Sequence, residues 1–204
     1  MVAIRIVGIV LAAGRSTRMG EVNKLTKVWE GRPLVAHVAE AARSSSLAEV
    51  LVVTGHQRET VIEHLNPDDI TVHNPDFATG MASSLRAGVQ RAAEKGADAA
   101  LILLGDMPLV TAEHIEAFIA AFRAAGEGNE KAPIVQASCR GKPGNPVLFP
   151  GRLFPDLLTL EGDTGARDLI KRHADNRLLL EIGEAAARDF DTPQAFDGES
   201  VDEA

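Results

Sequence analysis

The stretch "IVGIVLAAGRSTRMG", residues 6 to 20, joins a continuous apolar run to a loop that carries two arginines between glycines. The run is rich in β-branched residues, which is typical of a strand buried on both faces of a parallel sheet. A loop at the carboxyl end of such a strand is where open α/β sheets bind ligands. We therefore expect a parallel α/β fold in which this cationic loop holds an anion, and specifically a polyphosphate.

The rest of the chain alternates strand-like and helix-like runs, as βαβ units do. The patterns predict strands at residues 4–12, 49–55, 70–74, 99–106, 133–139, 141–149 and 176–182. They predict helices at residues 33–44, 58–65, 81–96, 111–126, 151–160 and 165–173. The sequence thus favours a single three-layer, Rossmann-like α/β domain over residues 1–204, whose mostly parallel sheet gains a mixed-direction edge from about residue 133.

Composition excludes several classes of protein. The chain has 204 residues, a net charge of -8 and only 4% aromatic residues, which disfavours nucleic-acid binding through phosphates or base stacking. Cys139 is the single cysteine, so an internal disulfide and a cysteine-based zinc cluster are excluded and a reducing cytoplasm is expected. The apolar run from Ile6 to Ala13 is too short for a membrane helix, and we expect no membrane partner.

The loop from Leu11 to Lys24 is the first candidate site. Glycines allow a close backbone approach to a ligand, and three basic residues, Arg15, Arg18 and Lys24, supply positive charge. The spacing matches neither the dinucleotide fingerprint nor the P-loop. The alternative is a solvated turn whose arginines face water.

Two acidic segments are the other candidates. Asp106 directly follows the predicted strand in "LILLGDMP", at the same edge of the sheet as the cationic loop. In "RDFDTP", Asp189 and Asp191 flank Phe190, and they share a face if the segment is extended. One or two carboxylates with phosphate oxygens and water are the usual ligands of Mg²⁺. The alternatives are a capped turn for Asp106 and a solvated acidic tail for Asp191.

Together, "LAAGRSTRMGEVNK", "GDMP" and "DFDTP" resemble the molybdenum-cofactor nucleotidyltransferases, the MobA-like NTP transferases, and most closely their CTP:molybdopterin cytidylyltransferase (MocA) branch. "NPDFATGMASSLRAG", "GNPVLF" and "GDTGAR" also have counterparts in that family. The resemblance implies a cytoplasmic Mg²⁺-dependent enzyme that moves CMP from CTP to molybdopterin and releases pyrophosphate. It further implies a nucleotide-binding part at residues 1–126, an acceptor-side part at 127–196 and an acidic tail at 197–204. A molybdoenzyme would be the further partner.

The resemblance also assigns residues. It implies catalytic roles for Arg15, Arg18, Lys24 and Asp106, and metal binding by Asp106 and Asp191. The implied nucleotide-binding residues are Leu11, Ala12, Ala13, Gly14, Arg15, Lys24 and Gly105. The implied acceptor-binding residues are Ser83, Ser84, Asn145, Asp163 and Arg167.

Three positions bear on specificity. Guanylyl-transferring members typically read "LAGG" and cytidylyl-transferring members "LAAG", so Ala13 favours CTP. Asn23 stands where an Asp often precedes the lysine, and Asn145 where a His is common before proline. Four alternatives remain open. These are GTP as donor, a sugar- or polyol-phosphate acceptor, a nicotinamide-dependent oxidoreductase on the same fold, and a non-catalytic partner of a molybdoenzyme.

Overall fold

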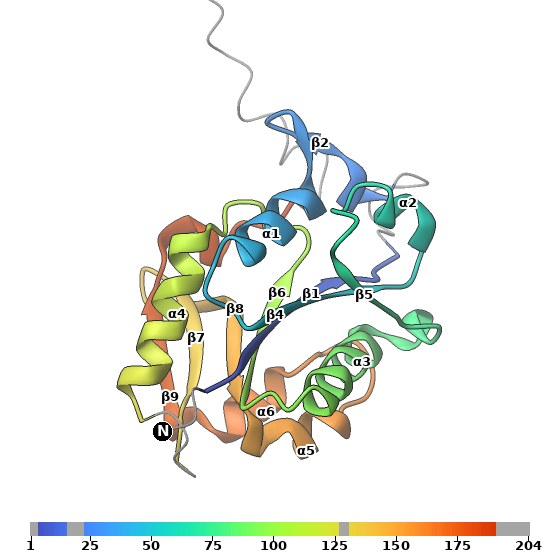
Figure 1. The fold of residues 1–204 in the computed structure, drawn as a ribbon. Coiled ribbons are helices and arrows are strands. Elements are labelled where there is room, and N and C mark those ends of the chain that lie inside the picture. Colours follow the sequence, from blue (N-terminus) through green and yellow to red (C-terminus); the bar gives the residue numbers. More distant parts are fainter. Residues whose placement is uncertain (1–3, 16–22, 127–130, 191–204) are drawn as a thin grey trace, which may run out of the picture.

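The protein is seen in a computed structural model that describes residues 4–15, 23–126 and 131–190. Seven strands of this described part form one sheet in the order β5-β4-β1-β6-β8-β7-β9 (Figure 1). β8 runs antiparallel to β6 and β7, and the other pairings are parallel. The strands are β1 Ile6–Ala12, β4 Glu49–Thr54, β5 Ile70–His73, β6 Ala99–Leu104, β7 Ile134–Cys139, β8 Lys142–Pro150 and β9 Arg177–Glu181.

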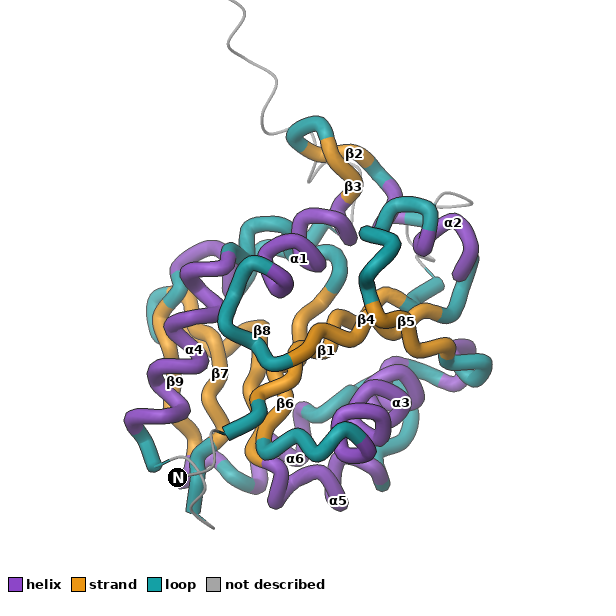
Figure 2. Tube along the Cα trace, viewed as in Figure 1, coloured by secondary structure: helices purple, strands orange, loops and turns teal. Residues whose placement is uncertain are grey.

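Helices cover both faces of the sheet (Figure 2). The helices are α1 Leu34–Arg43, α2 Arg58–Ile62, α3 Met81–Glu94, α4 Ala112–Ala124, α5 Phe154–Leu158 and α6 Arg167–Arg172. Apolar side chains of α1 and α4 pack with Val10 on one face of β1. Those of α3, α5 and α6 pack with Ile9 on the other face. The predicted three-layer α/β fold with a mixed-direction edge is confirmed.

Most predicted elements are present, and the differences have local causes. The predicted helix at 58–65 ends at Ile62, because the chain then tightens into turns in which the amides of His64 and Leu65 donate to carbonyls three residues back. The predicted helix at 151–160 is a 3₁₀ turn, η4 Gly151–Leu153, followed by the short α5. Thr111 caps α4 as expected, accepting a hydrogen bond from the amide of His114.

A small hairpin was not predicted from the sequence. β2 Val28–Trp29 pairs with β3 Arg32–Pro33, away from the main sheet. Glu30 and Gly31, the two residues between these strands, both have positive φ, as a two-residue type I′ hairpin turn requires. Strands of two residues are too short to show alternating polarity, so no sequence pattern indicated this hairpin.

The fold gathers loops at one edge. β1, β4, β5 and β6 are parallel, so their carboxyl ends, and the loops that leave them, lie along the same edge of the sheet. Among the described residues, no helix has the length and apolar character to cross a bilayer.

Candidate active site at the carboxyl edge of the sheet

The first loop and the Asp106 loop leave neighbouring strands. β1 and β6 pair in register, with Leu11 beside Leu104, and the amide of Gly105 donates to the carbonyl of Leu11 over 3.0 Å. A Cβ on Gly105 would lie 3.1 Å from that carbonyl oxygen and 3.3 Å from Cδ2 of Leu25. The absence of a side chain at Gly105 therefore allows the end of β1, the Leu25 side chain and the residue before Asp106 to pack together.

Lys24 reaches this point from a short 3₁₀ helix, η2 Lys24–Thr26. Asn23 caps the helix by accepting from the amide of Leu25 over 3.1 Å, and the buried Leu25 side chain anchors it in the core. Asn and Asp cap helices equally well. The departure from the family pattern at position 23 therefore leaves the support of Lys24 intact.

Lys24 and Asp106 form a direct hydrogen-bonded ion pair between Nζ and Oδ2. Their side chains are only 16% and 13% exposed, so both charged groups are partly desolvated yet accessible from solvent. In such surroundings charge–charge interactions are stronger than at a fully exposed surface. The arrangement offers an ammonium donor for phosphate oxygens next to a carboxylate that suits a divalent cation.

The C-terminal segment, the part of the chain that leads from the 3₁₀ helix η6 Gly183–Ala186 to Phe190, lies against the Asp106 loop. The amide of Phe190 donates to the carbonyl of Asp106 over 3.2 Å, and the Phe190 ring is fully buried. A role of Asp191 as a second metal carboxylate requires this segment to lie beside Asp106. Asp191, which follows Phe190, and Arg18 lie outside the described residues.

The nucleotide-loop candidates differ in exposure. Ala12 and Ala13 are buried, Leu11 is half-buried, and Gly14 and Arg15 are exposed. The carbonyl of Ala13 accepts from the amide of His56 over 3.2 Å. A Cβ on Gly55 would lie 2.9 Å from the Ala13 methyl group, which therefore packs against the protein interior. Any steric effect of this methyl on a bound base would be transmitted through its neighbours.

Ser83 and Ser84 are buried in the first turn of α3. Both accept hydrogen bonds from Nδ2 of Asn74, over 2.9 and 3.0 Å. The backbone amide of Asn74 donates to the backbone carbonyl of Thr54 over 2.8 Å. The two serines thus tie α3 to the carboxyl ends of β4 and β5. Asn74 was not among the candidate residues, although its place after a predicted strand was a signal.

Asp163 also contacts the start of α3. Its Oδ1 accepts from the amide of Met81 over 3.3 Å, and the carbonyl of Gly162 accepts from Ala82 over 3.0 Å. Gly80 has φ of 118°, and a Cβ there would lie 2.5 Å from the Gly162 carbonyl, so only glycine fits. Asp163 therefore caps α3 in this structure.

The two remaining acceptor-side candidates lie apart. Arg167 is the first residue of α6 and is exposed. β8 pairs with β6 so that Val147 faces Ile102. The half-buried Asn145 lies on β8, two residues before Val147. No contact of either side chain with the Lys24–Asp106 pair is seen in the described structure.

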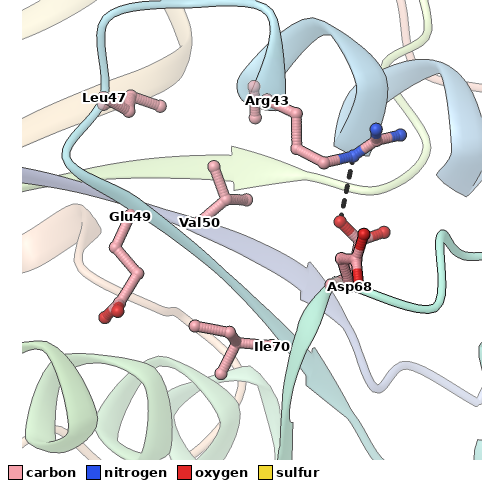
Figure 3. A pocket seen from close by; sticks show the side chains of 8 residues that line it. Arg43, Leu47, Glu49, Val50, Asp68 and Ile70 are labelled. Atoms are coloured by element: carbon pink, nitrogen blue, oxygen red, sulfur yellow. Dashed lines mark ion pairs between the residues drawn. The ribbon is translucent and has the colours of Figure 1, made fainter.

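A hollow of about 210 Å³ lies at the opposite edge of the sheet, where β4 and β5 begin (Figure 3). Nε of Arg43 pairs with the buried Asp69 over 3.0 Å, and Lys95 pairs with Glu49 over 3.2 Å. Asp68 is the remaining charged residue of the lining and is exposed. Because the buried charges neutralise one another, we place the candidate chemistry at the carboxyl edge.

Comparison with known proteins decides the family. The profile of the MobA-like NTP transferase domain matches residues 8–177, which include most of β1, the Lys24 helix and the Asp106 loop. This chain belongs to the MobA-like NTP transferase family. It is therefore a nucleotidyltransferase by family and fold, as its resemblance to this family implied.

Some relatives of this MobA-like NTP transferase match nearly its full length. It is 32% identical to the purine catabolism protein PucB of Bacillus subtilis over 210 residues, covering 94% of each chain. The crystal structure of Rv0371c from Mycobacterium tuberculosis H37Rv superposes with a TM-score of 0.80 at 26% identity, covering 97% of both chains. A structure of Rv0371c in complex with manganese superposes with a TM-score of 0.76 at 24% identity, covering 97% of this chain and 100% of that one.

The donor set of this MobA-like NTP transferase fits a divalent cation that is shared with phosphate. Within residues 4–15, 23–126 and 131–190, no three His, Cys, Asp or Glu side chains are grouped to hold a metal. Mg²⁺ needs no such group, because it is commonly bound through one or two carboxylates while substrate phosphates and waters fill the other positions. Asp106 offers one such carboxylate, and the amide of Phe190 contacts its backbone carbonyl.

Proposed function

We propose that this MobA-like NTP transferase moves CMP from CTP to the phosphate of molybdopterin in a Mg²⁺-dependent reaction. An oxygen of the acceptor phosphate attacks the α-phosphorus of CTP. The bond from the α-phosphorus to the oxygen that bridges to the β-phosphate breaks, and pyrophosphate leaves. The observation that carries the proposal is the Lys24–Asp106 ion pair beside the glycine-containing loop of β1.

Both reactants are anions, so the barrier is mainly electrostatic and positional. In the proposal, backbone amides of Leu11 to Gly14 approach the triphosphate, while Arg15, Arg18 and Lys24 donate hydrogen bonds to its oxygens. Asp106, with Asp191, would hold Mg²⁺, which when bound neutralises phosphate charge and orients the reacting groups. No protein nucleophile is needed.

Three observations support the finer assignments. The manganese complex of the mycobacterial relative supports a divalent cation. The "LAAG" sequence of the first loop supports cytidine over guanine, as in the family's cytidylyl-transferring members. Molybdopterin is supported by the resemblance to the MocA branch, with Ser83, Ser84, Asn145, Asp163 and Arg167 proposed on the acceptor side.

The experiment is a donor and acceptor matrix. The purified protein is incubated with Mg²⁺ and each of the four NTPs, with molybdopterin, with a sugar or polyol phosphate, or with no acceptor, and released pyrophosphate is measured. We expect release only with CTP and molybdopterin together. Release with GTP, or with a sugar phosphate, would replace the substrate assignment. NAD(P)H oxidation without pyrophosphate release would overturn the proposal.

A further inference from the structure

A small satellite core lies beside the candidate site. Trp29, Leu34 and Phe190 form a buried cluster separate from the two main cores, with Leu109 packed against it. The rings of Trp29 and Phe190 meet edge to face, with centroids 5.4 Å apart and planes at 61°. Such contacts add to the stabilisation that burial of the two rings provides.

Three residues of this cluster and its edge, Phe190, Leu109 and Leu34, are each linked to one partner of the ion pair. Phe190 donates its amide to the carbonyl of Asp106, and Leu109 follows Asp106 by three residues. On the lysine side, the amide of Leu34 donates to the carbonyl of Lys27 over 3.0 Å, and the amide of Lys27 donates to the carbonyl of Lys24 over 3.1 Å. The cluster therefore joins the Lys24 segment to the Asp106 loop.

The aromatic contact is itself held from both sides. Nε2 of His37, on α1, donates to the carbonyl of Trp29 over 2.8 Å, and the two rings also meet edge to face at 5.1 Å. The guanidinium of Arg188 lies 5.1 Å from the centre of the Phe190 ring, within range of a cation–π interaction. Trp29 and Phe190 therefore have little freedom to shift independently.

We propose that Phe190 and Trp29 are positioning residues that set the geometry of the Lys24–Asp106 pair. The Coulombic attraction in a largely buried ion pair is offset by the cost of desolvating both charges, so the pair alone is weak support for the two segments that it joins. Burial of the apolar rings of Trp29 and Phe190 carries no such desolvation cost. The C-terminal segment is thus part of the site through its packing, and not only through the carboxylate that follows it.

The proposal predicts coupling that needs no ligand. Trp29 is the only tryptophan of the chain, so intrinsic fluorescence reports on this cluster alone. If the cluster and the ion pair support each other, breaking the pair loosens the packing around the indole. Lys24→Met should then raise the quenching of Trp29 by acrylamide in the otherwise unchanged protein. In a Phe190→Leu background the same substitution should have no further effect.

Phe149 offers the matched control. It is as fully buried as Phe190 but lies on β8, in the core on the α3 side of the sheet. Phe149→Leu removes a similar apolar volume, and it should leave both the Trp29 quenching and its response to Lys24→Met unchanged. If Lys24→Met does not alter quenching in the unchanged protein, or if Phe149→Leu and Phe190→Leu behave alike, the inference is overturned.

A kinetic arm rests on the proposed function. With CTP and molybdopterin, Phe190→Leu should lower kcat by about 10- to 100-fold, since small misplacements of reacting groups have effects of this size. KM for CTP should change less, and Phe149→Leu should alter neither below its unfolding temperature. A kcat equal to that of Phe149→Leu contradicts positioning. If the unchanged protein shows no turnover with CTP and molybdopterin, the proposed function is wrong. The fluorescence test needs neither substrate, so it still tests the positioning role of Phe190 and Trp29.

Discussion

Lys24 and Asp106 are separated by 82 positions in the chain, yet their charged groups are in direct contact at the carboxyl edge of the sheet. Lys24 follows the first loop, and Asp106 lies two residues beyond the end of the central strand β6. Their contact is the point at which the cationic and acidic halves of the proposed site meet, and the expected effects of substituting either residue follow from it.

Removal of the Lys24 amine tests its proposed role as a phosphate donor. Lys24→Met keeps the apolar stem but deletes the charge, and we expect kcat/KM to fall roughly a hundredfold, as on loss of one preorganised donor. Pyrophosphate release measures this. Lys27→Met is the matched control, because this lysine C-caps the same 3₁₀ helix. Equal losses in the two variants would contradict a specific role for Lys24.

Neutralising Asp106 tests metal binding. Asp106→Asn keeps the size of the side chain but removes the charge that attracts a cation, so metal-dependent pyrophosphate release should be lost and Mn²⁺ binding, measured by calorimetry, should weaken at least about tenfold. Circular dichroism should be unchanged. Asp68→Asn replaces an exposed acid at the opposite edge and should behave as the parent protein does. Near-normal turnover of Asp106→Asn would remove Asp106 from the metal site.

Substitution of Gly14 distinguishes an effect on folding stability from an effect on nucleotide binding. A Cβ at this position would meet no atom of the described residues within 4 Å, so the described part of the free protein has room for alanine. If backbone amides of this loop approach the triphosphate closely, Gly14→Ala should leave the melting temperature within about 1 °C while raising KM for the NTP about tenfold or more. An unchanged KM would show that the phosphates bind elsewhere.

Ala13 tests the choice of base. Its methyl group packs beside Gly55, so Ala13→Gly opens space behind the loop and should relax the preference for CTP toward GTP. The measurement is a competition between the two nucleotides at equal concentration, followed by product analysis. An unaltered CTP to GTP ratio would exclude Ala13 as the determinant of specificity.

Glu181 makes stability depend on pH. Hydrogen bonds from the backbone amides of Arg140 and Gly141 lower the pKa of its carboxyl group, and the Ser138 hydroxyl adds to this. A depressed pKa in the folded state stabilises the fold above the ordinary glutamate pKa, and this contribution is lost as pH falls through the folded-state value. Glu181→Gln should therefore lower the melting temperature at about pH 7, with a difference that shrinks toward about pH 3.

The control for that experiment is Glu184→Gln, an exposed glutamate in the neighbouring 3₁₀ helix η6 Gly183–Ala186. It should follow the parent protein at every pH. A Glu181→Gln difference that stays constant down to the acid end would show that lost packing, and not ionisation, causes it.

The sequence predicted what local patterns determine. The continuous run of β1 marked a doubly buried strand, and Thr111 marked the start of α4, because periodicity and capping act over a few residues. The meeting of Lys24 with Asp106 followed from the rule that parallel strands bring their carboxyl ends to one edge.

Contacts between distant segments could not be read in this way. Asn74 binds Ser83 and Ser84, and Asp163 binds the amide of Met81. Each of these side chains is an ordinary turn or cap residue in its own segment, and nothing local identifies its partner. The edge-to-face contact of Phe190 with Trp29 could not be predicted for the same reason, since the two residues come from distant parts of the chain.

The narrow space beside Gly144 limits how this protein can be recombined with its relatives. A Cβ at that position would lie 1.9 Å from the carbonyl oxygen of Ala186, so β8 and the segment that leads to Phe190 share a gap with no room for a side chain. A recombination point between these two segments, in gene shuffling or in nature, combines packing surfaces from two different parent proteins. Chimeras that inherit both pieces from one parent should survive far more often than those that split them.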